Sequence, residues 1–370
     1  MLSNNDILSK TIMFLRFPLI VAVVFIHTNL TDIMINGTLL VNEGQFPIHD
    51  LFRHVMTNEL ARIAVPLFFF ISGFLFFYRS DFSLAVYGMK LKKRIRTLLI
   101  PYLFWNIIVF LLLLLTQLFL SSTTSGRNKL ISDYSWLDWL NLFWEHREGM
   151  PICYQFWFIR DLIFVILCSP AVYYFIRYGK IFSLIILGVL WTFGLWFKVP
   201  GISITAFFFF SFGAWFSINK RNFTIDFKPI LWPATILYMM LLVAGTLLWY
   251  NKVTGYSFLY NIGIVVGLVA IVAWTAYGIA KKRLCVSAFL AGSAFFVYAY
   301  HGMPIALITK YWVKLFQPAS EITMLAGYFL IPLFIVGVGI GVYAGLRKYF
   351  PAFTGLITGR GVNEISRFIS

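Results

Sequence analysis

Two ionisable residues in the first long apolar segment could take part in chemistry. Arg16 lies near the start of the run of residues 12–30, and His27 lies near its end. Eleven steps along an α-helix return to within about 20° of the same face and advance about 16 Å along the axis. One helix would therefore carry a guanidinium and an imidazole on a single stripe. Ionisable groups within a bilayer are costly and normally face a cavity or a partner, so the pattern indicates chemistry or transport.

Three other apolar segments carry an ionisable side chain at the level expected for His27. An arginine near a helix end can reach the interface, and a lone histidine can be a packed hydrogen-bonding residue, so each could be structural on its own. Four such residues at one depth favour a shared site instead. The predicted catalytic residues are His27, Arg62, Arg160 and His301.

Composition places the chain in a membrane. Of its 370 residues, 60% are hydrophobic and 12% are charged, and the mean hydropathy is +0.83, which excludes a soluble globular domain. Apolar runs of about 20 residues are long enough to cross a bilayer. We therefore predict an all-α polytopic membrane protein with about ten transmembrane helices, at residues 12–30, 56–78, 98–120, 156–177, 181–198, 202–219, 230–250, 258–280, 286–309 and 323–346.

The formal net charge of +16 at pH 7 follows the topology rather than indicating a nucleic-acid partner. With the N-terminus in the cytoplasm, 19 of the 30 Lys and Arg residues fall in inner segments and 8 fall in outer segments. This bias agrees with the positive-inside rule and is favoured by the anionic lipids of the inner leaflet. We predict that both termini are cytoplasmic, that membrane lipids are partners and that nucleic acid is not.

The apolar segments form one continuous membrane domain, without a soluble appendage or a low-complexity linker between them. We predict a single domain over residues 1–370, with a core of about 10–348 and a short cytoplasmic tail at 349–370. No convincing internal repeat is present, which disfavours a transporter built from inverted repeats.

Two long outer loops are expected, at about residues 31–55 and 121–155. The first contains His49 and His54, whose spacing fits no common zinc site, and we expect both to be loop residues. The three cysteines are scattered and form neither a metal-binding nor a disulfide pattern. No metal is predicted.

Several blocks of the sequence together resemble the membrane acyltransferase 3 family. They are Arg16 with His27, the run from Arg62 through Val65-Pro66 to Ser72-Gly73-Phe74, Lys93 to Arg96 with Pro101-Tyr102, Trp157-Phe158 through Ser169-Pro170, and Tyr298 with His301. The resemblance runs from about residue 10 to about residue 345, and the block from Arg62 to Phe74 is its most specific part. Phe14 and Pro18 depart from it, because small or polar residues are common at those positions.

The resemblance implies ten spans and an O-acyltransferase of extracytoplasmic glycans, which usually takes acetyl from cytoplasmic acetyl-CoA. The expected reaction is transfer of an acetyl group to a hydroxyl of a cell-envelope polysaccharide or lipid-linked sugar. The expected partners are acyl-CoA and the glycan acceptor, and the expected location is the bacterial inner membrane.

The same resemblance suggests a role for each candidate residue. Acyl-CoA is polyanionic, so inner-level cations would bind it, although they could equally serve topology and lipid contact: Arg16, Lys92, Lys93, Arg94 and Arg96. His27 would act as general base on the hydroxyl, or would be acylated transiently. Arg62 or Arg160 would hold the thioester oxyanion, and His301 would orient His27 or the acceptor. The predicted substrate-binding residues are Glu59, Trp157 and Tyr298.

Two other function classes fit part of the pattern. A proton-coupled exporter of glycan or lipid precursors could use the same intramembrane His and Arg residues without any acyl-CoA. A structural scaffold for an envelope-synthesis complex gives no reason for a shared layer of ionisable groups.

Overall fold

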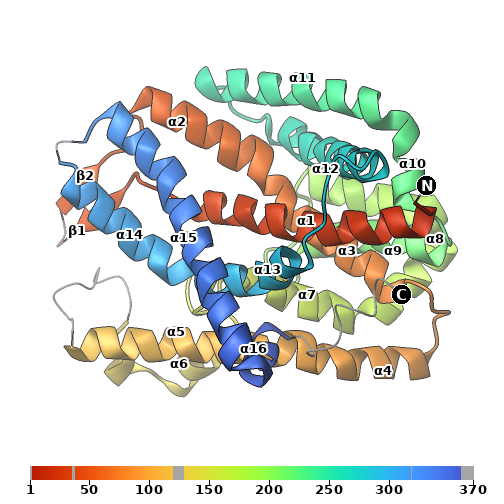
Figure 1. Ribbon diagram of the computed structural model, residues 1–370, viewed down its shortest axis with the longest axis horizontal. Helices are drawn as coiled ribbons and strands as arrows, with labels where there is room; N and C mark the ends of the chain where they lie inside the picture. The colour runs from red at the N-terminus through yellow and green to blue at the C-terminus, as the bar shows by residue number, and fades with distance from the viewer. Residues whose placement is uncertain (1, 36–37, 120–128, 318, 360–370) are drawn as a thin grey trace.

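The computed structural model describes residues 2–35, 38–119, 129–317 and 319–359, and these are mostly helical (Figure 1). Seven helical segments in them are long and apolar enough to cross a membrane, and an eighth is formed if one sharply bent pair is counted as a span. The prediction of an all-helical, multi-pass membrane protein is confirmed. The count of ten spans and the side on which each terminus lies stay predictions, and residues 120–128 and 360–370 of the expected outer loop and tail lie outside the described residues.

Helix α1 (Asn4–His27) runs through the middle of the molecule (Figure 1). The Ser3 hydroxyl caps the first turn by accepting a hydrogen bond from the Asp6 amide, and the Asp6 carboxylate accepts one from the Ser3 amide. These bonds satisfy backbone donors that have no partner at the start of a helix. Around α1 pack four other helices: α3 (Ala64–Phe77), α12 (Ser257–Ala280), α13 (Ala288–Tyr300) and α15 (Glu321–Tyr349). The stripe that carries Arg16 and His27 therefore lies inside the bundle rather than on its surface.

One continuous helical run leads into α3. It consists of α2 (Pro47–Arg53), the π-helix η1 (His54–Leu60), the 3-10 helix η2 (Ala61–Ile63) and α3 itself. The expectation of a loop as far as residue 55 is therefore wrong from residue 47 onward. His49 and His54 are both helical and buried. A short antiparallel hairpin, β1 (Ile33–Ile35) and β2 (Thr38–Val41), precedes this run.

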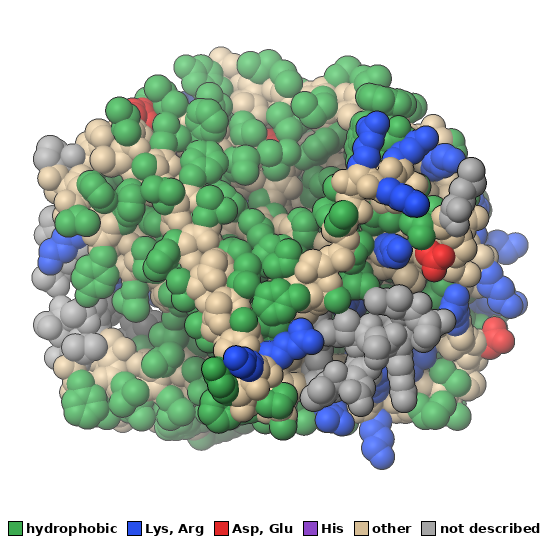
Figure 2. Space-filling model, in the orientation of Figure 1, with side chains coloured by type: hydrophobic (Ala, Val, Ile, Leu, Met, Phe, Trp, Pro, Cys, Tyr) green, Lys and Arg blue, Asp and Glu red, His purple; other side chains and the backbone are tan. Residues whose placement is uncertain are grey.

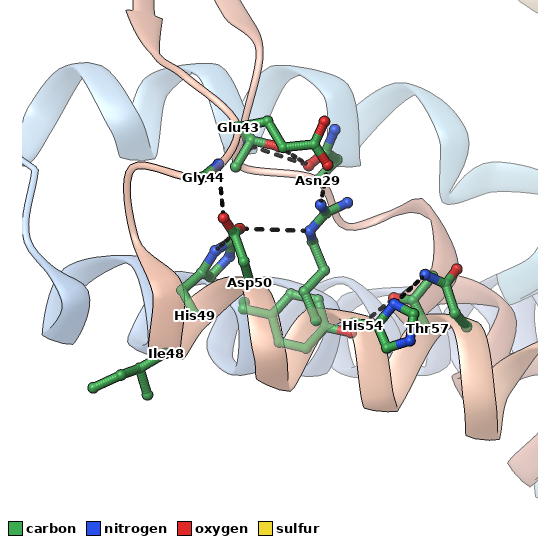
Figure 3. Close-up of polar contacts among 12 residues, drawn as sticks. Asn29, Glu43, Gly44, Ile48, His49, Asp50, His54 and Thr57 are labelled. Atoms are coloured by element: carbon green, nitrogen blue, oxygen red, sulfur yellow. Dashed lines mark hydrogen bonds and ion pairs between the residues drawn. The ribbon is translucent and has the colours of Figure 1, made fainter. Parts of the chain in front are cut away.

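Paired polar groups explain why hydropathy missed α2. His49 Nδ1 lies 3.0 Å from Asp50 Oδ1, and the other oxygen of Asp50 accepts from the Gly44 amide (Figure 3). Arg53 donates to Glu43 at 2.8 Å. Each of these polar side chains thus has at least one polar partner nearby, which lets a polar sequence stay helical among apolar neighbours.

The closest helix crossing joins α3 to α9 (Ile204–Ile218). A Cβ on Gly73 would collide with the carbonyl of Phe210, and a Cβ on Gly213 would collide with the carbonyl of Phe70. Small residues at both crossing points let the two backbones touch, as is typical of helix pairs in membranes.

The middle of the chain matches one expected boundary and departs from another, because the predicted span 156–177 is interrupted at Cys168. Helix α7 (Trp157–Leu167) ends before Pro170, which opens α8 (Ser169–Thr192). Lys180 interrupts α8 with a φ of 50°, so the break lies where residues 156–177 and 181–198 were expected to separate.

The last third of the chain contains one sharp bend. The expectation of one straight helix over 286–309 is wrong, because α13 and α14 (Gly302–Leu315) meet at an angle of 66°. Pro304 has no amide hydrogen for the Tyr300 carbonyl, which favours a break at this point.

The remaining helices complete the bundle and its rim. They are α4 (Leu84–Arg94), the π-helix η3 (Ile95–Leu99), α5 (Ile100–Phe119), η5 (Ile131–Asp133), α6 (Trp136–Asn141), η6 (Tyr154–Phe156), α10 (Phe223–Asp226), η7 (Lys228–Ile230), α11 (Leu231–Tyr250) and α16 (Pro351–Thr358).

The α3–α9 crossing yields a stability prediction. Gly73→Ala should lower the thermal midpoint of the detergent-solubilised protein, because overpacking a tight contact costs about 1–3 kcal/mol. Gly337→Ala is the matched control, since no atom lies within 4 Å of the added carbon there and alanine favours a helix. Equal midpoints for the two variants would contradict the close packing of α3 and α9.

Candidate active site

The two predicted catalytic histidines, His27 and His301, lie side by side at one end of α1. The His27 ring centroid lies 5.3 Å from that of His301, and 5.1 Å from that of Tyr154 in an edge-on arrangement. His27 is half-buried, and its side chain makes no hydrogen bond within the described part of the chain. The structure thus joins residues from the first helix, the η6 turn and the bend between α13 and α14.

His301 is held in one orientation at the bend. Its side chain is fully buried, and Nδ1 lies 2.7 Å from the backbone carbonyl of Tyr298. Because a carbonyl only accepts, Nδ1 carries the proton and Nε2 keeps a lone pair. Nε2 has no hydrogen-bond partner among the described residues, so it is available as a base or an acceptor.

Tyr298 supports this arrangement rather than pointing toward the imidazoles. Its hydroxyl donates to the backbone carbonyl of Gln155 at 2.5 Å, and its ring stacks on Phe156 with centroids 5.4 Å apart. Gln155 in turn donates to the carbonyl of Ala299 at 3.0 Å. These bonds tie η6 to α13 and so fix Tyr154 beside His27. Gln155 and Tyr154 were missed from the sequence, because nothing local links them to residues near 300.

Arg160 is buried and its donors are occupied. Nε and one terminal nitrogen donate to Asp161 Oδ1 at 3.0 and 2.8 Å, and the other terminal nitrogen donates to the carbonyls of Trp144 and Gly149. The guanidinium therefore fastens the loop after α6 to α7. Trp157 is half-buried at the start of the same helix.

Arg62 and Glu59 lie in a second polar cluster, next to α11 and α12. Glu59 is buried with Oε1 3.4 Å from His54 Nε2, and the His54 ring stacks on Trp249 with centroids 4.2 Å apart. The Arg62 guanidinium is exposed and lies 5.5 Å from the centroid of the Tyr260 ring. In the described ranges no hydrogen bond joins Arg62 or Arg160 to either imidazole of the His27 pair.

A cavity of about 460 Å³ lies further along α1, toward the N-terminus. Three of the predicted donor-binding cations line it: Arg16, Lys93 and Arg94. Lys92 and Arg96 are exposed on the same segment and do not line it. Met13 of α1 and Phe295 of α13 also contribute to the wall, so the cavity adjoins the two helices that end at the histidine pair.

Positive charge gathers at this end of the molecule. Figure 2 shows many Lys and Arg side chains around the N-terminus, whereas hydrophobic side chains cover the middle of the face. We call this region, which contains Arg79, Arg94 and Lys220, the basic end. Lys90 also lines the cavity and was missed from the sequence; its ammonium donates to Ser80 Oγ and to the Phe76 carbonyl.

Comparison with known proteins adds three findings. A family model described as an acyltransferase domain matches residues 10–345. The chain is also 29% identical over 188 residues to the succinoglycan biosynthesis protein ExoH of Rhizobium meliloti (strain 1021). That alignment covers 48% of this chain and 46% of the relative, so it spans about half the length of each protein. No solved structure matches.

The match covers nearly the whole of this multi-pass helical chain. The chain belongs to the acyltransferase 3 family of membrane proteins.

Proposed function

We propose that this protein is an O-acyltransferase of the bacterial inner membrane. It transfers an acyl group, acetyl in our proposal, from cytoplasmic acyl-CoA to a hydroxyl of a cell-envelope polysaccharide or lipid-linked sugar. The family supports acyl transfer, and the name of the relative ExoH supports a glycan acceptor. The observation that carries the proposal is that one helix links a cationic cavity to a pair of imidazoles.

The cavity at the basic end suits the donor. Acyl-CoA carries several phosphate charges, which Arg and Lys side chains bind through charge-assisted hydrogen bonds. Arg16, Lys93 and Arg94 come from two different elements and face one space. In the proposal they hold the phosphates while the flexible pantetheine arm extends along α1 and α13 toward His27.

The histidine pair suits the transfer step. His27 takes the proton from the acceptor hydroxyl as its oxygen attacks the thioester carbonyl carbon. The carbon–sulfur bond then breaks, and His27 returns the proton to the departing thiolate. His301 stabilises the His27 imidazolium through its Nε2 lone pair, whose position the Tyr298 carbonyl fixes. Transient acylation of His27 stays the competing route.

The two predicted arginines take different roles in this proposal. Arg160 has its donors bound to Asp161 and two backbone carbonyls, so it positions the outer loop. Arg62 is exposed and lies on η2, which packs against α1. Arg62 is therefore the residue that we assign to the developing oxyanion. Glu59 and Trp157 remain candidates for contact with the acceptor.

A proton-coupled exporter is the second candidate function. The buried His54–Glu59 pair favours it, because a carboxylate and an imidazole inside a membrane protein are typical of proton relays. An exporter would move protons with its substrate and would release no CoA.

A prediction about activity concerns His27. Purified protein in liposomes, given acetyl-CoA and an envelope glycan extract, should release CoA, and His27→Ala should lower the rate by about 100-fold or more, the usual contribution of a general base. His146→Ala is the matched control, because His146 is a loop histidine whose amide hydrogen-bonds Met150 outside the site. A fully active His27→Ala protein would exclude the mechanism, and substrate-driven proton flux without CoA release would favour the exporter.

A further prediction separates the roles of the two arginines, Arg62 and Arg160. Arg160→Gln should lower the thermal midpoint strongly, because it leaves Asp161 buried without its charge partner, a change that typically costs about 3–5 kcal/mol. Arg62→Gln should leave the midpoint unchanged and should lower kcat. Thermal unfolding and turnover measured on the same preparations test both statements, and the reverse pattern would exchange the two roles.

A further inference from the structure

A second cavity of about 570 Å³ lies at the basic end, beside the first one. Leu8 and Tyr78 line both cavities, so the two spaces share a wall. The second cavity opens at the ends of α3 and α9 and beside Tyr173 and Arg177 of α8, and its lining is more polar than apolar. None of the residues predicted to bind the donor belongs to it.

Four cationic side chains from three parts of the chain line this second cavity: Arg79, Arg177, Lys220 and Arg221. Arg79 follows α3, Arg177 lies on α8, and the other two follow α9. Asp81 is the one carboxylate in the lining, so the wall carries three more positive than negative side chains.

The existing contacts leave much of this charge uncompensated. Lys220 Nζ lies 4.0 Å from Asp81, and Arg221 donates to Asp226 at 2.8 Å. The Arg79 guanidinium lies 5.1 Å from the centroid of the Tyr78 ring. Within the described residues, Arg79 and Arg177 form no hydrogen bond or ion pair. Two guanidinium groups that line a cavity and form no ion pair with a carboxylate there are suited to an organic phosphate.

We propose that the second cavity binds the 3′-phosphate of the acyl-CoA nucleotide. The inference rests on the proposed function and extends it. In acyl-CoA the thioester is followed by the pantetheine arm, then the diphosphate, and then the ribose with its 3′-phosphate. Arg16, Lys93 and Arg94 line the first cavity, which in this proposal binds the pantetheine and diphosphate groups of the donor. The second cavity adjoins it on the side of Leu8 and Tyr78, farther along α1 from His27, where the nucleotide end must lie.

The test compares acetyl-CoA with acetyl-3′-dephospho-CoA as donors. Wild type in liposomes should have a KM for acetyl-CoA about tenfold lower than for the dephospho donor, because a charge-assisted bond is lost without the phosphate. In the double variant Arg79→Gln, Arg177→Gln, the KM for acetyl-CoA should rise about tenfold and the KM for the dephospho donor should not change. The preference for the phosphorylated donor should therefore disappear.

Two controls keep the result specific. Arg283→Gln removes a charge near the same end outside both cavities, and it should keep the preference. The double variant Arg79→Lys, Arg177→Lys keeps both positive charges. It should retain most of the preference for the phosphorylated donor. Because both arginines are exposed, the thermal midpoints should match that of wild type.

The remaining outcomes overturn the inference in distinguishable ways. Equal KM values for the two donors in wild type would exclude the 3′-phosphate while leaving acyl transfer intact. A lipid headgroup offers the same phosphate chemistry. If a lipid headgroup occupied the second cavity instead, the double variant would lose activity only in liposomes containing phosphatidylglycerol, and not in pure phosphatidylcholine. Failure of wild type to use any acyl-CoA would exclude the proposed function and this inference together.

Discussion

The cost of burying ionisable groups among apolar helices constrains this whole structure. An unpaired charge or an orphaned polar group in such surroundings loses several kcal/mol of hydration free energy, so each must find a partner or a cavity. Arg160 meets this requirement with a carboxylate and two backbone carbonyls, and His49 meets it at Nδ1 with Asp50. The histidine pair meets it only in part, since Nε2 of His301 keeps no partner among the described side chains. His49 also has an unpartnered Nε2, so the feature that favours a reactive role at His301 is the second imidazole, His27, beside it.

Helix α1 connects the parts of the proposed enzyme. Its half toward the N-terminus lines the cationic cavities, and its last residue meets His301. A rigid helix can hold these regions at a fixed separation, which a donor with a long flexible arm can span. The bend between α13 and α14 has the complementary role, because it turns the backbone where His301 must face His27.

Arg62 and Arg160 show how packing gives different surroundings to two residues that look equivalent in sequence. Arg62 and Arg160 both open apolar segments, yet one is exposed over Tyr260 and the other is buried in a network. The difference lies in their surroundings: Asp161 and the carbonyls of the loop after α6 are within reach of Arg160, and Tyr260 of α12 is within reach of Arg62. Apart from Asp161, the residues that contact each arginine lie more than ten positions away from it in sequence.

Sequence alone determined the class of protein and most of the helices. Long apolar runs predict membrane helices because a bilayer requires about 20 apolar residues and internally bonded backbone, and the spacing of Arg16 and His27 follows from helix periodicity. Hydropathy failed at residues 47–55, where polar side chains compensate one another, and it gave no sign of the bend at His301. Tertiary structure decided that His27 meets His301, that Arg160 fastens a loop and that four cations surround a second cavity. These contacts join residues up to hundreds of positions apart, and they depend on how helices pack together, which the periodicity of a single helix cannot specify.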